Sequence, residues 1–264
     1  MINIRMLLTA FCLIAVSLSG QTRILFDNTH AQVAGSASWT ITTGYSDFAG
    51  ELSKAGFEVN ALNQGPINLD TLNEFDILVI PEPNRPFSAD EISAIKTYTH
   101  EGHGLFLICD HNGSDRDGDG WDSIRIYTVF VSDFGFSFDK RTMSEHPLTN
   151  KLNHCSVMSG VEHVGSWGAT SISILKPASV TGLICFSAKY GGNPLIVVSK
   201  YGQGRIAAIG DSSPFDDGSK NSSKSRTLYD NYNMPDYDHH QMSVNLVKWC
   251  AGQLGEDLQL TPIP

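Results

Sequence analysis

Carboxylate and imidazole side chains recur where short apolar runs of this sequence end. Acidic residues follow four such runs, histidines stand close to two of these acids, and one further histidine begins a late apolar segment. The set consists of Asp27, His30, Glu82, Asp110, His111, Asp211 and His239. Carboxylate and imidazole groups together are typical ligands of Zn²⁺ and other divalent metals. A metal held there would lower the pKa of its bound water to about 7 and generate a hydroxide nucleophile.

Each of these residues also has a simpler interpretation, because Asp, Asn and Ser cap the helices that follow strands. If the set is functional, Asp27 and Asp211 would be neighbours when their strands are central. The metal ligands would then be Asp27, His30, Asp110, His111, Asp211 and His239. The catalytic residues would be Asp110, His111, Asp211 and Glu82, with Glu82 as a general base.

The densest acidic motif lies between the two halves of the chain. It reads Asp115-Arg116-Asp117-Gly118-Asp119-Gly120-Trp121-Asp122. Carboxylates at alternate positions followed by glycine can surround a hard cation with oxygen ligands. The motif resembles the D-x-D-x-D-G start of calcium loops in EF-hand, dockerin and thrombospondin-type repeats, although Ile126 replaces the EF-hand Glu at the twelfth position. We predict Ca²⁺ binding by Asp115, Asp117, Asp119 and Asp122, with a solvated Asp/Gly turn as the alternative.

Apolar runs and helical segments alternate in the first half of the sequence. The expected strands cover residues 23–27, 57–61, 76–80 and 105–109, and the expected helices cover 45–55 and 88–102. Ser88 and Glu91 form the capping-box pattern of the second helix. Continuous apolar strands between helices are typical of βαβ units with a parallel sheet covered on both faces. Sites in such sheets form outside the carboxyl ends of the strands, which is where the acidic residues stand.

The second half is less regular. We expect a helix over 122–130, strands over 169–175 and 183–187, a hairpin formed by 195–199 and 205–209, a polar loop over 211–238 and a closing helix over 239–251. The hairpin is indicated by the turn Tyr201-Gly202-Gln203-Gly204 between two apolar runs. The pattern favours one domain over residues 21–252, followed by a tail over 253–264.

Residues 1–20 are typical of a signal peptide. Arg5 precedes the apolar run Met6–Val16, and Ser17-Leu18-Ser19 is a small-x-small cleavage site. A membrane anchor is the alternative, but the run is shorter than the ~20 residues that span a bilayer. We therefore predict a secreted or periplasmic protein without a membrane span. Four cysteines would remain after cleavage: Cys109, Cys155, Cys185 and Cys250. Three disulfide pairings are possible among them, but Cys109 and Cys250 lie in apolar patterns and could equally be small buried hydrophobic residues.

The composition excludes several classes of protein. The 264 residues are 41% hydrophobic and 17% charged, which argues against a disordered chain, a coiled coil and a polytopic membrane protein. The formal net charge of −10 argues against a dedicated nucleic-acid binder, because phosphate recognition needs a basic surface.

Four segments, taken together, resemble a known superfamily. They are Ile24–Gln32 (ILFDNTHAQ), Asp47-Phe48-Ala49, Asp110–Asp115 (DHNGSD) and Gly210-Asp211-Ser212-Ser213. They resemble secreted bacterial proteins of the class I glutamine amidotransferase-like superfamily over roughly residues 23–252. The resemblance implies a flavodoxin-like α/β fold, a three-layer sandwich with a mostly parallel sheet, here with a C-terminal hairpin. The catalytic Cys-His-Glu set of amidotransferases is missing, since no glycine flanks Cys109 and no C-terminal His-x-Glu follows.

Two functional hypotheses follow, because the superfamily includes both enzymes and non-catalytic modules. The first is a secreted metal-dependent hydrolase acting on an extracellular small molecule or polymer. It requires three or more of the named side chains to lie within about 2.0–2.6 Å of one metal. The second is a non-catalytic, calcium-stabilised binding module for a glycan or cell-surface partner. Its candidate contact residues are Trp39, Trp121 and Trp167.

Overall fold

The computed structural model describes residues 20–149, 154–219, 231–255 and 257–260. The predicted signal peptide therefore lies outside the described residues, apart from Gly20. None of the described helices is long and apolar enough to cross a membrane.

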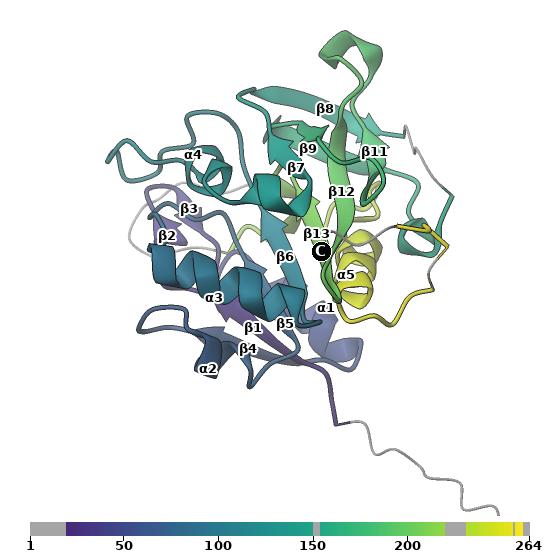
Figure 1. The fold of residues 1–264 in the computed structure, drawn as a ribbon. Helices are drawn as coiled ribbons and strands as arrows, with labels where there is room; N and C mark the ends of the chain where they lie inside the picture. Colours follow the sequence, from purple (N-terminus) through teal and green to yellow (C-terminus); the bar gives the residue numbers. More distant parts are fainter. Residues whose placement is uncertain (1–19, 150–153, 220–230, 256, 261–264) are drawn as a thin grey trace, which may run out of the picture.

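A seven-stranded sheet forms the centre of the molecule (Figure 1). Its order is β11-β12-β13-β6-β5-β1-β4. The parallel strands are β1 (Arg23–Asp27), β4 (Glu58–Leu62), β5 (Ile77–Ile80), β6 (Gly104–Ile108) and β13 (Gly204–Ile209). Two antiparallel strands complete one edge, β12 (Pro194–Tyr201) and β11 (Val180–Cys185). Numbered along the chain, the parallel strands lie in the order 2-1-3-4-5, which is the flavodoxin-like order. The predicted fold class and the β12–β13 hairpin are confirmed.

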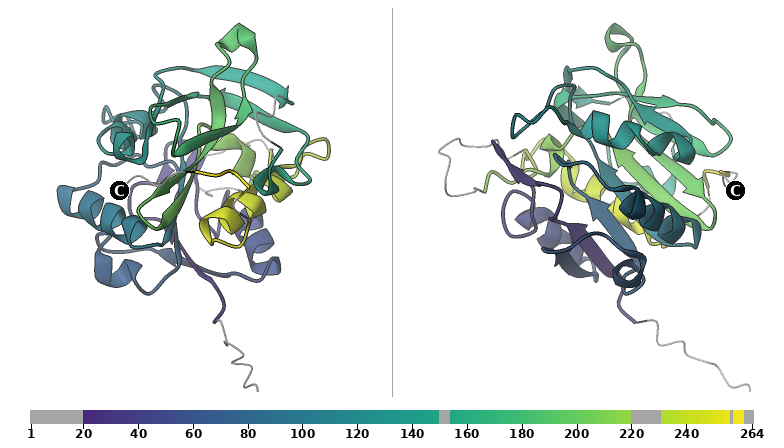
Figure 2. Two further views of the ribbon diagram at one scale, coloured as in Figure 1. Left: turned by 45° about the vertical axis from the view of Figure 1, so that its right-hand side comes forward. Right: turned by 60° about the vertical axis from the view of Figure 1, so that its left-hand side comes forward.

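Helices cover both faces of the sheet, and the two layers are visible from either side in Figure 2. One face packs against α1 (Ser46–Lys54) and α5 (His239–Cys250), and the other against α2 (Leu69–Leu72), α3 (Ala89–His100) and α4 (Ser123–Thr128). Side chains of a strand alternate between its faces. Ile24 and Phe26 of β1 therefore enter the first layer, while Leu25 enters the second. Continuous apolar strands are needed because both faces are buried.

The helix starts follow the capping rules. The Ser88 hydroxyl accepts a hydrogen bond from the Glu91 backbone N–H, and the Glu91 carboxylate accepts one from the Ser88 N–H, so the predicted capping box is confirmed. Asp122 caps α4 by accepting the Arg125 N–H at 2.8 Å. Such caps satisfy backbone donors that the first helical turn leaves free.

Small two-stranded sheets and short 3-10 turns complete the fold, and all but the β2–β3 pair and part of η1 lie in the second half of the chain. The paired strands are β2 (Val33–Ala34) with β3 (Ala37–Ser38), β7 (Phe136–Phe138) with β10 (Ile172–Ile174), and β8 (Met143–Leu148) with β9 (Val164–Ala169). The 3-10 turns are η1 (Val131–Phe134), η2 (Ser156–Met158), η3 (Ala188–Tyr190) and η4 (Ser213–Phe215).

The predicted single strand over residues 169–175 is wrong. It is divided between β9 and β10, because the Thr170 N–H bonds to Gly210 and the Ser171 hydroxyl bonds to Asp139. These polar contacts interrupt the strand, so that residues before Thr170 pair in the β8–β9 sheet and residues after Ser171 pair in the β7–β10 sheet. The predicted strand over 183–187 also differs, since β11 starts at Val180 and ends at Cys185.

The four cysteines predicted to remain after cleavage are free thiols. Cys109, Cys185 and Cys250 are buried, and Cys155 is half-buried. Burial raises the pKa of the Cys109 thiol well above its ordinary value, which keeps it protonated and unreactive. Cys109 and Cys250 are therefore small buried hydrophobic residues, which is the second of the two interpretations.

Candidate functional site

Four carboxylates lie at the carboxyl ends of four neighbouring strands. Asp211 follows β13, Asp110 follows β6, Glu82 follows β5, and Asp27 ends β1. All four are buried, with at most 1% of the residue exposed. The expectation that Asp27 and Asp211 are neighbours is wrong, because β5 and β6 separate their strands. Asp110 and Glu82 lie between Asp211 and Asp27, so the four carboxylates form one row along the carboxyl ends of the strands.

One guanidinium joins the two central carboxylates. Arg116 donates from Nε to Glu82 Oε1 at 2.9 Å and from Nη2 to Asp110 Oδ2 at 2.5 Å. Trp39 Nε1 donates to the second Glu82 oxygen at 2.6 Å, and the Ser212 hydroxyl donates to Asp110 Oδ2 at 2.6 Å. A single buried cation shared by two carboxylates offsets part of the cost of removing them from water.

Sequence reasoning did not include Arg116 among the functional residues. In the sequence it stands between Asp115 and Asp117 of the acidic loop. One sequence feature could have indicated its role. Arg116 is the single basic residue in a motif of carboxylates, and this motif begins a few residues after Asp110. The strand-end acids were predicted to bind a metal cation. At Glu82 and Asp110 the positive charge is instead the guanidinium of Arg116.

Burial dominates the electrostatics of this edge. Desolvation raises the pKa of Glu82 to about 7, even though Arg116 acts in the opposite direction. Desolvation also raises the pKa of Asp211 to about 7 and raises that of Asp110, where Arg116 again opposes the shift. Repulsion from neighbouring carboxylates adds to each shift. Groups that titrate near neutral pH can both take up and release protons, as general acid–base catalysis requires.

The fourth carboxylate belongs to a separate network. Asp27 Oδ2 lies 2.8 Å from His30 Nδ1 and accepts Gln32 Nε2 at 3.0 Å, while the Thr29 N–H and hydroxyl donate to Asp27 Oδ1. His30 Nε2 lies 3.3 Å from Glu91 Oε1 on α3. Both ring nitrogens of His30 therefore face carboxylates of the protein. This imidazole links β1 to the start of α3.

His239 does not join the strand-end acids. Its Nδ1 lies 2.7 Å from the Asn231 carbonyl oxygen, and its Nε2 accepts the Gly165 N–H at 3.0 Å. Burial lowers the pKa of His239 to about 4, so the ring is neutral. Since both nitrogens are occupied, the predicted role of His239 as a metal ligand does not fit this geometry.

Asp211 holds the backbone of β9 beside the strand ends. Its carboxylate accepts the Trp167 N–H at 2.7 Å and the Ser213 N–H at 2.8 Å. The strand-end acids thus bind different protein groups. Among the residues that the structure describes, no three of them bring their ligand atoms close enough together for one metal.

His111 is the strand-end residue most open to solvent. Its side chain is 28% exposed, whereas that of Asp110 is 2% exposed. Nδ1 lies 3.0 Å from the Asn112 carbonyl oxygen, an interaction that places the proton on Nδ1. Nε2, 3.9 Å from Asp110 Oδ1, then carries a lone pair. Gly168 lies against the ring, so a side chain at that position would crowd it.

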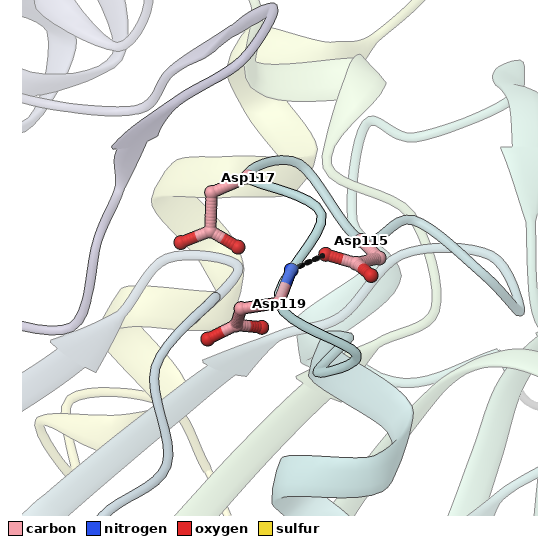
Figure 3. A group of neighbouring side chains, drawn as sticks. All are labelled: Asp115, Asp117 and Asp119. Carbon is pink, nitrogen blue, oxygen red and sulfur yellow. Dashed lines mark hydrogen bonds between the residues drawn. The ribbon is translucent and has the colours of Figure 1, made fainter.

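Three carboxylates of the acidic loop do lie together (Figure 3). Asp115, Asp117 and Asp119 each offer one oxygen, and these oxygens lie within 4.8 Å of one another. Asp115 accepts the backbone N–H groups of Gly118, Asp119 and Gly120, and Gly120 has a φ of +97° that favours glycine. Opposite ligands of Ca²⁺ at 2.3–2.6 Å would be about as far apart, so the three residues fit the first half of a calcium loop.

Asp122 is not part of this group. One of its oxygens caps α4, and the other accepts the Gly113 N–H at 2.8 Å. It is 2% exposed. The capping interpretation of Asp122 is the one the structure supports, and a complete calcium shell would need oxygen ligands besides these side chains.

The loop is held against the β2–β3 hairpin. Gly35 has a φ of +55°, and a Cβ atom there would lie 2.0 Å from the Arg116 carbonyl oxygen. Only glycine fits this approach. The hairpin, the loop and the Arg116 side chain are therefore packed as one unit beside the strand ends.

Comparison with known proteins shows the fold but no family. No family model matches this sequence, and no curated protein matches it. The mmIFT52 N-terminal domain superposes with a TM-score of 0.68 at 14% identity, over 88% of this chain and 98% of that one. Cytoplasmic Protein STM1381 from Salmonella typhimurium LT2 gives 0.60 at 13% identity, over 89% of this chain and 100% of that one.

A putative ThuA-like protein from Bacteroides uniformis ATCC 8492 is also similar. Its TM-score is 0.54 at 14% identity, over 87% of this chain and 91% of that chain. ThuA-like proteins have a glutamine amidotransferase-like fold, which agrees with the flavodoxin-like architecture. At these identities the similarity concerns the fold alone.

The buried carboxylates predict a characteristic pH dependence of stability. Because the folded-state pKa of Glu82 is raised from 4.5 to about 7, its contribution to stability is full below pH 4.5 and is lost as the pH rises through about 7. Glu82→Gln should therefore show a smaller fall in melting temperature between about pH 5 and about pH 8 than the wild type. Differential scanning calorimetry measures this difference.

Exposed Glu74→Gln is the matched control and should retain the wild-type slope. His239 contributes with the opposite sign in both proteins, since its lowered pKa costs stability as the pH falls below 6.5 toward about 4. Equal slopes for Glu82→Gln and the wild type would contradict the assignment.

Removal of the shared cation should be strongly destabilising. Arg116→Met leaves two buried carboxylates without their partner, and the expected loss of unfolding free energy is about 3 kcal/mol. Chemical denaturation measures it, with exposed Arg141→Met as control. Adding Glu82→Gln to Arg116→Met should recover part of the loss. A change below about 1 kcal/mol, which is the range of surface ion pairs, would show that the bridge is unimportant.

Proposed function

We propose that the protein is a secreted hydrolase whose dependence on a metal comes from calcium in the Asp115–Asp119 loop. The observation that carries this proposal is the position of Arg116. Its backbone belongs to the loop between two candidate calcium ligands, and its guanidinium lies between Glu82 and Asp110 at the strand ends. Calcium that orders the loop would thereby also order the charge arrangement of the site. The proposal of secretion rests on the pattern of residues 1–20.

His111 is the acid–base residue in this proposal. Its side chain is partly exposed, and Nε2, when unprotonated, can take a proton from water as the water oxygen attacks the substrate. The same nitrogen then gives the proton to the leaving group. Asp110, 3.9 Å away, stabilises the imidazolium that forms between these two steps.

The other strand-end groups position this pair. Arg116 is 19% exposed and can donate hydrogen bonds to a substrate oxygen at the mouth of the site, while Glu82 and Asp110 hold its guanidinium. Asp211 fixes the Trp167 backbone, and so the segment that packs on His111. Glu82 and Asp211 remain proton-exchanging groups near neutral pH, but every oxygen of these two carboxylates already accepts a hydrogen bond from the protein.

A substrate screen tests the hydrolase directly. The wild type should cleave at least one class among p-nitrophenyl esters, glycosides and phosphates, and His111→Ala should reduce that rate by about 100-fold or more. His154→Ala changes an exposed histidine away from the strand ends and should leave the rate unchanged. Absence of hydrolysis for all three classes, or equal rates in the His111 variant, would rule the assignment out.

Calcium should stabilise the protein through the loop. At a free concentration about 100 times its Kd, calcium bound only to the folded state would add about 2.7 kcal/mol to the unfolding free energy. Asp117→Asn should reduce both this gain and any calcium-dependent part of the hydrolytic rate. Asp236→Asn, a change to an exposed acid elsewhere, serves as control. If the melting temperature is the same in calcium and in chelator, the loop has no metal-binding role.

A non-catalytic, calcium-stabilised binding module is the second candidate, because an aromatic ring is exposed beside the loop. Trp121 is 39% exposed, whereas Trp39 is 4% exposed and donates to Glu82. An exposed ring next to a calcium loop could stack on a sugar of a glycan or cell-surface partner. This candidate predicts that Trp121→Ala abolishes glycan binding on an array without a change in melting temperature. Unchanged binding would leave the hydrolase as the better explanation.

A further inference from the structure

A separate cavity of about 440 Å³ opens beside the ends of β1 and β4. Its size lies within the range of small-molecule sites. The residues that line it are Asn28, Thr29, Ala31, Val33, Asn63, Gln64, Gly65 and Arg85. None of them belongs to the His111 site or to the acidic loop.

The cavity lies beside the topological switch point of the sheet, which falls between β1 and β5. The chain passes from β1 to β4 on one side, and from β4 to β5 on the other side of β1. The connections that leave β1 and β5 run in opposite directions, and such diverging loops form a crevice outside the carboxyl ends, which is the usual ligand position in open α/β sheets. Asn28 and Thr29 follow β1, Asn63 and Gln64 follow β4, and Arg85 follows β5.

One wall of the cavity is held in an unusual backbone conformation. Ala31 has a φ of +56°, which L-residues other than Asn, Asp and His rarely adopt. The buried Asn84 fixes this segment, because its side-chain amide donates to the Ala31 carbonyl oxygen at 3.3 Å and its backbone N–H donates to the His30 carbonyl oxygen at 2.8 Å. Such local strain, supported from behind, is typical of ligand sites.

The polar groups around the cavity are side-chain amides, which can bind hydroxyl groups, and one guanidinium, which can bind an anionic group. Arg85 is exposed and, among the described residues, has neither an ion pair nor a hydrogen bond, and the same holds for the Gln64 side chain. Asn28 Oδ1 in the wall is a buried acceptor without a donor, although its amide nitrogen donates to Asn63. Val33, 45% exposed, offers an apolar surface.

The charge of the cavity is opposite to that of the molecule. The protein carries a formal net charge of −10, yet the lining contains one guanidinium and no carboxylate. Asp27, behind Thr29, is already bonded to His30, Gln32 and Thr29. A single free guanidinium matches a planar monoanionic carboxylate, whereas a phosphate dianion would retain excess negative charge in an acidic protein.

We propose that this cavity is a binding site for a carboxylated sugar, a hexuronate unit, with Arg85 on the carboxylate, the amides on the hydroxyls and Val33 against the ring. The site goes beyond the proposed hydrolase and does not depend on it. The two regions touch through Asn84, whose side-chain oxygen accepts the Arg116 N–H at 3.3 Å.

Isothermal titration of the purified protein with D-glucuronate, D-glucose and D-glucose 6-phosphate tests the site. D-glucuronate should bind with one site per chain and more tightly than the other two sugars. Arg85→Gln should raise its Kd by about tenfold or more, since a charge-assisted hydrogen bond is lost. Gln64→Ala should also weaken binding. Lys140→Gln, an equal change of charge on an exposed residue elsewhere, should not.

His111→Ala should bind D-glucuronate like the wild type, which separates this site from the proposed hydrolytic one. Because Arg85 has no partner among the described residues, Arg85→Gln should retain the wild-type melting temperature. The proposal is overturned if D-glucuronate gives no saturable heat up to about 10 mM, if glucose or glucose 6-phosphate binds as tightly, or if Arg85→Gln leaves the Kd unchanged.

Discussion

Burying four carboxylates side by side is unfavourable, since each loses its hydration and repels the others. In this protein the four carboxylates differ in the groups that offset this cost. Arg116 is shared by the two central acids, the His30 ring faces the outer Asp27, and Asp211 relies on two backbone N–H groups. The raised pKa values of the central groups show that neutralisation is incomplete. An arrangement kept despite this cost is the pattern expected of a functional site rather than of a structural core.

The remaining features of this region contact the backbone of Arg116 or of its loop. The loop that carries Arg116 is shaped by hydrogen bonds to Asp115 and is packed on the β2–β3 hairpin at Gly35, where no side chain fits. Its backbone is also held by Asn84, which supports the wall of the neighbouring cavity. The acidic loop, the charge at the strand ends and the shape of the cavity are therefore physically connected.

Much of the fold follows from local patterns. The apolar strands around Ile24 and Phe26, the Ser88 capping box and the hairpin turn at Gly202 each specify their structure through burial, capping or backbone freedom. Local patterns did not predict the strand bounds and side-chain roles that depend on residues far away in the sequence. The division of 169–175 depends on Asp139 and Gly210, and the roles of Arg116 and His239 depend on partners dozens of residues away in sequence. Strand order, which separates Asp27 from Asp211, is likewise a property of the whole sheet.

We propose that Arg116 couples calcium binding in the Asp115–Asp119 loop to the strand-end acids. Binding free energies coupled in this way are reciprocal, so loosening the guanidinium at the strand ends must weaken calcium binding at the loop. Calorimetric calcium titration of the wild type and of the Glu82→Gln, Asp110→Asn double variant measures this coupling. The account predicts one calcium site in the wild type and an affinity lower by about fivefold or more in the variant. Equal affinities, or no calcium binding by the wild type, would contradict it.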